Sequence, residues 1–255
     1  MEKDILQDWI ENKRVELQHQ RHAISSQMLL AMGRDRMERK TISLREAVAS
    51  SASGVIAEFA RKNPTTGWSC QKAKISEALS SFVQAGACAC SIQTDGRFYG
   101  GALGDLKKAR DLVKLPLLRK DLILDCYQLL QSRVMGADAV SLIASTLTPE
   151  DCRILTDSAH GLQMEVVLEI HKEEELDYVH DDIDLIRIDL RDAGDARANM
   201  ERSLALADQL KGKEPLLISG FEISEAETIR FREAGFRGFI LGDAYRKRMI
   251  EDSCI

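Results

Sequence analysis

Residues 136–170 read GADAVSLIASTLTPEDCRILTDSAHGLQMEVVLEI and contain two short apolar runs separated by one amphipathic segment. The runs Ala139–Ala144 and Glu165–Ile170 have the length and composition of buried strands. Between them, Thr148–Asp151 supplies an N-cap threonine, a proline and an acid at the third helical position, and Gly161 marks the helix end. The segment therefore predicts a strand, a helix and a second strand, which is the unit of a parallel sheet.

The same alternation continues in both directions along the chain. A glycine also precedes an apolar run at Gly86, Gly136 and Gly235, which is typical of helices that end just before strands. Eight strands alternating with helices in 255 residues predict an α/β fold, the (β/α)₈ TIM barrel. An open doubly wound sheet is the alternative. The predicted strands are Val55–Phe59, Ala87–Ile92, Leu115–Leu118, Ala139–Ala144, Glu165–Ile170, Ile183–Ile188, Leu216–Ile218 and Gly238–Leu241.

The first 50 residues have a different pattern. Apolar side chains recur at helical spacing in Ile5–Ile10, among charged residues, and Ser43–Val48 forms another short amphipathic stretch. We therefore expect an N-terminal helical extension over residues 1–50, followed by the barrel over residues 51–255, within a single domain overall.

Composition and charge restrict the partners. The chain is 44% hydrophobic and 30% charged with a formal net charge of −6, and no basic block could follow a nucleic-acid backbone. The charged N-terminus has no signal-peptide core, and no run of apolar residues is long enough to span a membrane, so we expect a cytoplasmic protein. The six cysteines contain no C-x-x-C pair, and we expect no metal site. The expected assembly is a monomer or homodimer.

Three charged residues are placed to carry chemistry. Glu58, Lys120 and Glu169 lie at the ends of the first, third and fifth predicted strands, and alternate strands of a barrel contribute to one interior layer. Two acids and one amine would converge at the barrel mouth, which suits general acid and base catalysis. The alternative is that each is a solvated strand end paired with a nearby ion.

Two glycine turns follow the last two strands, at Ser219–Gly220 and at Gly242. Loops at these places in a barrel often bind phosphate through backbone N–H groups, so the pair favours a phosphorylated small-molecule substrate. Asp243 opposes this, because a carboxylate repels phosphate unless it points away.

With these residues in place, the chain resembles the indole-3-glycerol phosphate synthase family over nearly its whole length. The block Leu118–Asp121 with its downstream Tyr127–Gln128 is the specific part of the match, whereas the glycine turns are common. The matching segments are Ile56–Phe59, Asn63–Pro64 with Gly67, Thr94–Asp95, Phe98–Gly101, Pro116–Asp121 with Tyr127–Gln128, Gly136–Ala139, Leu168–His171, Arg191–Asp192, Ser219–Gly220 and Gly238–Gly242.

The resemblance implies a cofactor-free lyase of tryptophan biosynthesis. It implies that 1-(2-carboxyphenylamino)-1-deoxyribulose 5-phosphate is cyclised, decarboxylated and dehydrated to indole-3-glycerol phosphate. Lys120 would be the general acid of ring closure, Glu169 the base or acid of dehydration, and Glu58 would orient the amines. The implied substrate and phosphate positions are Tyr99, Leu122, Asp189, Arg191, Ser219, Gly220, Gly242 and Asp243.

Four positions depart from the family pattern in charge. Ala60 and Ile218 stand where the family has a lysine and a glutamate, while Arg187 and Asp189 replace a glycine and an asparagine. The four changes cancel in net charge. Arg187 would point into the barrel one layer below Asp189. It either replaces part of the missing lysine's charge or, the favoured reading, braces Asp189 or Glu169 as an ion-pair partner.

Two further changes make the expected aromatic pocket more polar and more open. Gln93 replaces an apolar residue, and Leu122 replaces a phenylalanine. Together the departures leave two alternatives to an active or weakly active synthase. One is a catalytically silent barrel that binds a phosphorylated metabolite or a protein partner, and the other is an enzyme of altered specificity.

Overall fold

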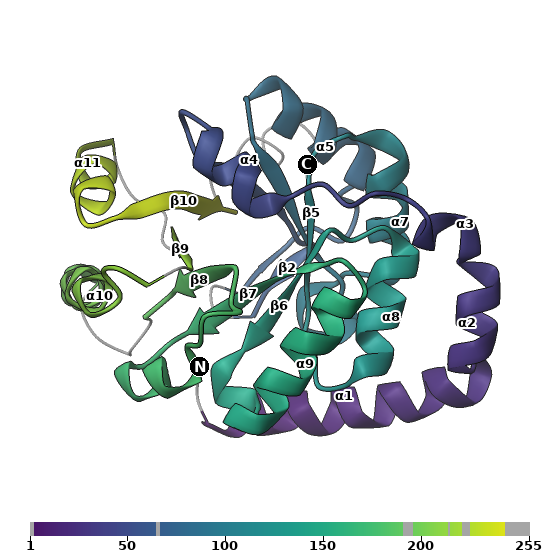
Figure 1. Cartoon of the computed structure of the whole chain (residues 1–255). Helices are drawn as coiled ribbons and strands as arrows, with labels where there is room; N and C mark the ends of the chain where they lie inside the picture. The colour runs from purple at the N-terminus through teal and green to yellow at the C-terminus, as the bar shows by residue number, and fades with distance from the viewer. Residues whose placement is uncertain (1–2, 65–66, 191–195, 214, 221–224, 243–255) are drawn as a thin grey trace.

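The computed structural model describes residues 3–64, 67–190, 196–213, 215–220 and 225–242. Its eight main strands are all parallel and close into a barrel in the order β1-β10-β9-β8-β7-β6-β5-β4 (Figure 1). The predicted TIM barrel is confirmed, and the open-sheet alternative is wrong because β1 pairs with both β4 and β10. The strands are β1 (Val55–Phe59), β4 (Ala89–Gln93), β5 (Leu117–Lys120), β6 (Ala139–Ile143), β7 (Glu165–Ile170), β8 (Leu185–Ile188), β9 (Leu216–Ser219) and β10 (Phe236–Leu241).

Helices connect most of the strands on the outside of the barrel (Figure 1). Two details were not predicted: a small antiparallel pair, β2 (Lys62–Asn63) with β3 (Trp68–Ser69), follows β1, and a 3₁₀ helix, η2 (Glu173–Tyr178), connects β7 to β8. None of the described helices is both long and apolar enough to cross a membrane. The connecting helices are α5 (Ile75–Gln84), α6 (Gly96–Tyr99), α7 (Leu103–Leu112), α8 (Cys126–Met135), η1 (Ala144–Thr146), α9 (Pro149–Gly161), α10 (Ala196–Gln209) and α11 (Glu225–Glu233).

The helix boundaries follow most of the sequence signals. Thr148 and Asp151 form a reciprocal capping box at the start of α9, a contact that contributes about 1 kcal/mol. Gly136 ends α8 with a left-handed backbone, as predicted. Gly161 does not end α9 in this way, because the helix includes it and the positive φ falls later, on Gln163.

Two helices of the N-terminal segment close opposite ends of the barrel (Figure 1). Leu44 and Val48 of α4 pack into the apolar cluster inside the amino-terminal end of the barrel. Trp9 of α1 packs on Leu122 and Ile143, at the carboxyl-terminal end. Because barrel enzymes place their sites at that end, α1 lies over the candidate site. The N-terminal helices are α1 (Lys3–Ala23), α2 (Ser26–Met32), α3 (Arg34–Met37) and α4 (Leu44–Ser50).

Candidate active site

A band of polar side chains crosses the barrel interior above its inner apolar cluster. Glu58, Lys120 and Glu169 each lie two residues beyond a member of that cluster on the same strand, so strand alternation turns all three inward. Lys120 and Glu169 are buried and Glu58 is partly buried, with Ser91 donating to its carboxylate at 3.4 Å. The predicted convergence is therefore present, and the alternative of solvated strand ends is wrong for Lys120 and Glu169.

Lys120 and Glu169 form the central ion pair. Lys120 Nζ lies 2.8 Å from Glu169 Oε1 and 2.9 Å from Oε2, and Ser141 also donates to Oε1. Burial by itself raises the pKa of Glu169, but the positive charges of Lys120 and Arg187 outweigh burial and hold the pKa well below its usual range. Glu169 is therefore ionised at neutral pH.

Arg187 joins two carboxylates in the same band. Its Nη1 donates to Glu169 Oε2 and its Nη2 to Asp189 Oδ2, both at 2.8 Å. Burial lowers the pKa of Arg187, but Glu169, Asp189 and Glu58 together raise it above its ordinary value. The brace hypothesis for Arg187 is confirmed, with both predicted partners bound at once.

Gly220 is required beside this brace. A Cβ built on Gly220 would lie 2.7 Å from Asp189 Cγ and 2.8 Å from Arg187 Nε, closer than real Cβ atoms approach. Gly220 follows β9 directly and pairs with the neighbouring strand through its N–H to Ile188. Its backbone therefore packs against the Arg187–Asp189 pair, in addition to any role in a phosphate loop.

The two predicted phosphate turns lie side by side. Ser219 ends β9 and is buried, Gly242 follows β10 and is buried, and β9 and β10 are neighbours in the barrel. The other two predicted substrate residues of this region, Arg191 and Asp243, lie outside the described residues.

An apolar cluster closes the mouth of the barrel above the polar band. Trp9 lies 5.6 Å from both Phe98 and Tyr99, measured between ring centroids, and packs with Leu122 and Ile143. Leu122, predicted to face the aromatic part of the substrate, is fully buried here. Sequence reasoning assigned no site role to Trp9, although its place on a helix of the N-terminal extension was a usable signal.

Lys13 fixes α1 to the barrel rim. Its ammonium lies 2.9 Å from both Asp95 Oδ2 and Asp121 Oδ1, and only 1% of its side chain is exposed. Trp9 Nε1 donates to the same Asp95 carboxylate. Burial lowers the pKa of Lys13, but Asp121 and Asp95 outweigh burial and raise it. The four-residue spacing of Trp9 and Lys13 places both on one helix face, a signal that sequence reasoning missed.

His171 is a third residue that sequence reasoning left without a role. It follows Glu169 by two positions, and this spacing directs both side chains to the same side of the strand. Burial lowers the pKa of His171, opposed by the charges of Glu169 and Asp189. A largely neutral imidazole therefore adjoins the ion pairs at neutral pH.

Two of the departures from the family pattern are neighbours on the inner wall. The pairing of Phe59 with Ile92 places Ala60 beside Gln93, and both are buried. The Gln93 amide oxygen has no hydrogen-bond partner among the described residues. An acceptor therefore lies next to the space that the alanine leaves.

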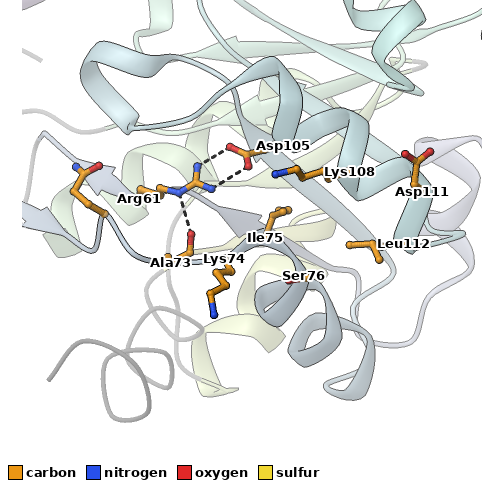
Figure 2. Close-up of a pocket in the computed structure, with 10 residues that line it drawn as sticks. Arg61, Ala73, Lys74, Ile75, Ser76, Asp105, Lys108, Asp111 and Leu112 are labelled. Atoms are coloured by element: carbon orange, nitrogen blue, oxygen red, sulfur yellow. Dashed lines mark hydrogen bonds and ion pairs between the residues drawn. The ribbon is translucent and has the colours of Figure 1, made fainter.

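Other parts of the molecule offer weaker sites. A cavity of about 430 Å³ lies outside the barrel between α5 and α7, where Arg61 forms a bidentate ion pair with Asp105 and Lys74 and Lys108 lie at the edge (Figure 2). The described residues contain no group of histidine, cysteine or acidic side chains that could hold a metal ion. The barrel interior remains the candidate active site.

Comparison with known proteins identifies the family. The family model described as indole-3-glycerol phosphate synthase matches residues 6–251. The chain belongs to the indole-3-glycerol phosphate synthase family. A relative of that name from Bacteroides thetaiotaomicron is 46% identical over 246 residues, covering 96% of this chain and 94% of the relative. Another from Carboxydothermus hydrogenoformans is 35% identical and covers 81% of this chain and 80% of its own length.

Solved structures agree on the fold. A mutant tryptophan synthase α-subunit from Pyrococcus furiosus superimposes with a TM-score of 0.59 at 14% identity, over 78% of this chain and 91% of that one. At this identity the likeness shows the barrel fold alone. The resemblance predicted from the sequence is confirmed by the family match, which places the chain among the carboxy-lyases of tryptophan biosynthesis and does not favour a silent barrel.

Proposed function

We propose that the chain converts 1-(2-carboxyphenylamino)-1-deoxyribulose 5-phosphate to indole-3-glycerol phosphate, carbon dioxide and water, without a cofactor. The observation that supports the proposed catalytic roles is the buried ion pair of Lys120 and Glu169, which lies below the apolar cluster at the barrel mouth. The mouth fits the aromatic part of the substrate, and the turns after β9 and β10 fit its phosphate. We also propose that the enzyme is cytoplasmic. It is a monomer or a homodimer, and light scattering can distinguish these two oligomeric states.

Lys120 is the proton donor in the ring closure. As the aromatic carbon attacks the substrate ketone, the carbonyl oxygen gains negative charge and takes a proton from the Lys120 ammonium. Carbon dioxide then leaves with its bond electrons retained by the ring. Loss of the new hydroxyl as water needs a proton from solvent on the departing oxygen. The ring nitrogen keeps its hydrogen, and the ring carbon beside it loses a proton. Glu169, which its two cations keep ionised, accepts that proton.

The remaining contacts position the substrate. Glu58, partly buried on the opposite wall, accepts from the substrate amine, while Tyr99 and Leu122 pack against the ring. Ser219, Gly220 and Gly242, with Arg191 and Asp243 beyond the described residues, form the phosphate end of the site. Ala60 offers no positive charge to the anionic groups of the substrate. These groups therefore depend on backbone N–H groups for binding in this part of the site.

The test is indole fluorescence after addition of the carboxyphenylamino-deoxyribulose phosphate to purified protein. We expect turnover by the unaltered chain and a loss of about 10²- to 10⁴-fold in Lys120→Met. Lys108→Met, which removes a lysine at the outer cavity, is the matched control and keeps full activity. Ala60→Lys is run in parallel, and we expect it to lower KM. A folded protein that is inactive with and without Ala60→Lys would contradict the proposal.

A further inference from the structure

Arg187 is a fully enclosed cation at the centre of the catalytic band. Only 5% of the residue is exposed, and its two terminal nitrogens donate to two carboxylates, Glu169 of β7 and Asp189 directly after β8. Because the guanidinium is planar and rigid, the two carboxylates are held at a fixed separation and orientation. The second carboxylate oxygen of Glu169 stays within 2.8 Å of Lys120.

The charges around Arg187 show what its loss would do. Lys120 and Arg187 are the two cations of the band, and Glu169, Asp189 and Glu58 are three anions around them. Without Arg187, Lys120 alone would face three carboxylates, and two neighbouring carboxylates would repel each other. The titratable and charged groups that face Arg187 or its partners are Glu58 of β1, Lys120 of β5, Glu169 and His171 of the β7 end, Asp189 after β8, and Tyr99 of α6.

Both hydrogen bonds that Arg187 makes to described residues are directed at the site. Its Nε has no hydrogen-bond partner among the described residues, and Gly220 packs against that nitrogen. A buried N–H group without an acceptor lowers the free energy of unfolding. A side chain that served only to fill the barrel interior would not be expected to carry such a group. What Arg187 retains are two bonds, both to carboxylates of the band.

We propose that Arg187 is a positioning residue for the reaction, acting with Asp189 as one unit. It keeps the Glu169 carboxylate turned toward Lys120, and Asp189 balances the charge that Arg187 brings. The proposal rests on the proposed function above. It adds that positions 187 and 189 act as a coupled pair, in which either substitution alone impairs the reaction more than the two together.

The test compares Arg187→Gln, Arg187→Lys and the double variant Arg187→Gln with Asp189→Asn. For Arg187→Gln we expect kcat to fall about 10²-fold with little change in KM, because the proton acceptor is misplaced while substrate binding is retained. The acidic side of the plot of kcat against pH moves to higher pH, because the pKa of Glu169 rises when a neighbouring positive charge is removed. The double variant recovers part of kcat and moves the acidic side of the plot back, and Arg187→Lys recovers less, because an ammonium lacks the planar fork.

Arg119→Gln is the matched control. It removes a buried arginine that also pairs with an aspartate two residues later, but on the outer face of the barrel wall, and we expect its pH profile to be that of the unaltered chain. Circular dichroism confirms folding in each variant. An unchanged kcat and pH profile in Arg187→Gln, or an equal shift in Arg119→Gln, would overturn the proposal.

A second measurement separates this inference from the proposed function. The carboxyl ¹³C resonance of Glu169, assigned with Glu169→Gln, is titrated in the absence of substrate. We expect the carboxyl to stay ionised over the accessible acid range in the unaltered chain and to titrate at higher pH in Arg187→Gln. This readout holds even if the chain does not turn over the expected substrate, and identical titrations in the two proteins would refute the role of Arg187.

Discussion

Two arginine–aspartate pairs in this protein share a spacing and a distance but face opposite sides of the barrel wall. Arg119 of β5 and Arg187 of β8 each pair at 2.8 Å with the aspartate two residues later, Asp121 and Asp189, just past the strand end, and all four residues are buried. The outer arginine uses every nitrogen, donating to Asp121, the Thr94 hydroxyl, and α8. Within the part of the chain that the structure describes, the inner arginine donates only to carboxylates of the active-site band.

The difference shows that the same local motif acquires its role from the face it occupies. The outer pair joins β5 to α8 and, through Asp121 and Lys13, to α1, so it stabilises the arrangement of the wall and its cap. The inner arginine bonds two carboxylates of the band and so determines the charge state around Lys120. We therefore expect substitutions in the outer pair to lower mainly the stability of the protein and substitutions in the inner pair to lower mainly its activity.

The largest expected effect on stability is that of Arg119→Met. It leaves the buried Asp121 with one cation fewer and breaks the bonds to α8, so we expect the free energy of unfolding to fall by about 3 to 5 kcal/mol. Urea unfolding at pH 7 measures this change. A loss below about 1 kcal/mol would show that Lys13 and Thr94 satisfy Asp121 without the arginine, and the comparison would fail.

Gly220→Ala disturbs the packing of the inner pair without removing a charge. The added methyl would meet Asp189 and Arg187 at under 3 Å, so we expect a loss of about 1 to 3 kcal/mol together with reduced turnover. Gly104→Ala in α7 is the control, because a Cβ there meets nothing within 4 Å and alanine favours a helix. Should Gly220→Ala retain full kcat, the close packing of the inner pair would have no catalytic importance.

The pH dependence of stability tests the role of Asp121 in the outer pair. Burial raises the pKa of Asp121, but Arg119 and Lys13 outweigh burial and lower it from 3.8 to about 2. A carboxyl with a lowered folded-state pKa contributes stability above pH ~4 and loses it as the pH falls toward 2, here about 2 kcal/mol. Urea unfolding at pH 7 and pH 3 should therefore show a smaller pH dependence in Asp121→Asn. Equal pH dependence in the two proteins would contradict this assignment.

The sequence predicted the barrel because each of the eight barrel strands contains or adjoins a buried apolar run and most helix ends carry a cap or glycine signal. The active-site charges were predictable for the same reason, since alternation within a strand fixes which side chains point inward. Glu58, Lys120 and Glu169 needed only that rule.

Contacts between distant segments were harder to predict. Nothing local to Lys13 indicates that it lies between Asp95 and Asp121, because the two aspartates follow β4 and β5 and their approach to Lys13 depends on how α1 crosses the barrel. The double bonding of Arg187 was open for a related reason. A buried arginine demands a partner, and Asp189 follows Arg187 by two residues, but only the register of β7 and β8 also places Glu169 opposite Arg187.

The smallest expected effect isolates one bond of the outer pair. Ser132 and Ser203 are both fully buried helix serines that donate to the carbonyl four residues earlier, but only Ser132 also accepts from Arg119, at 3.1 Å. Ser132→Ala should therefore lower the free energy of unfolding by about 1 kcal/mol more than Ser203→Ala, with turnover unchanged in both. If the two alanine variants are equally stable, Arg119 does not depend on this hydroxyl, and its role in holding α8 rests on the Gln128 carbonyl alone.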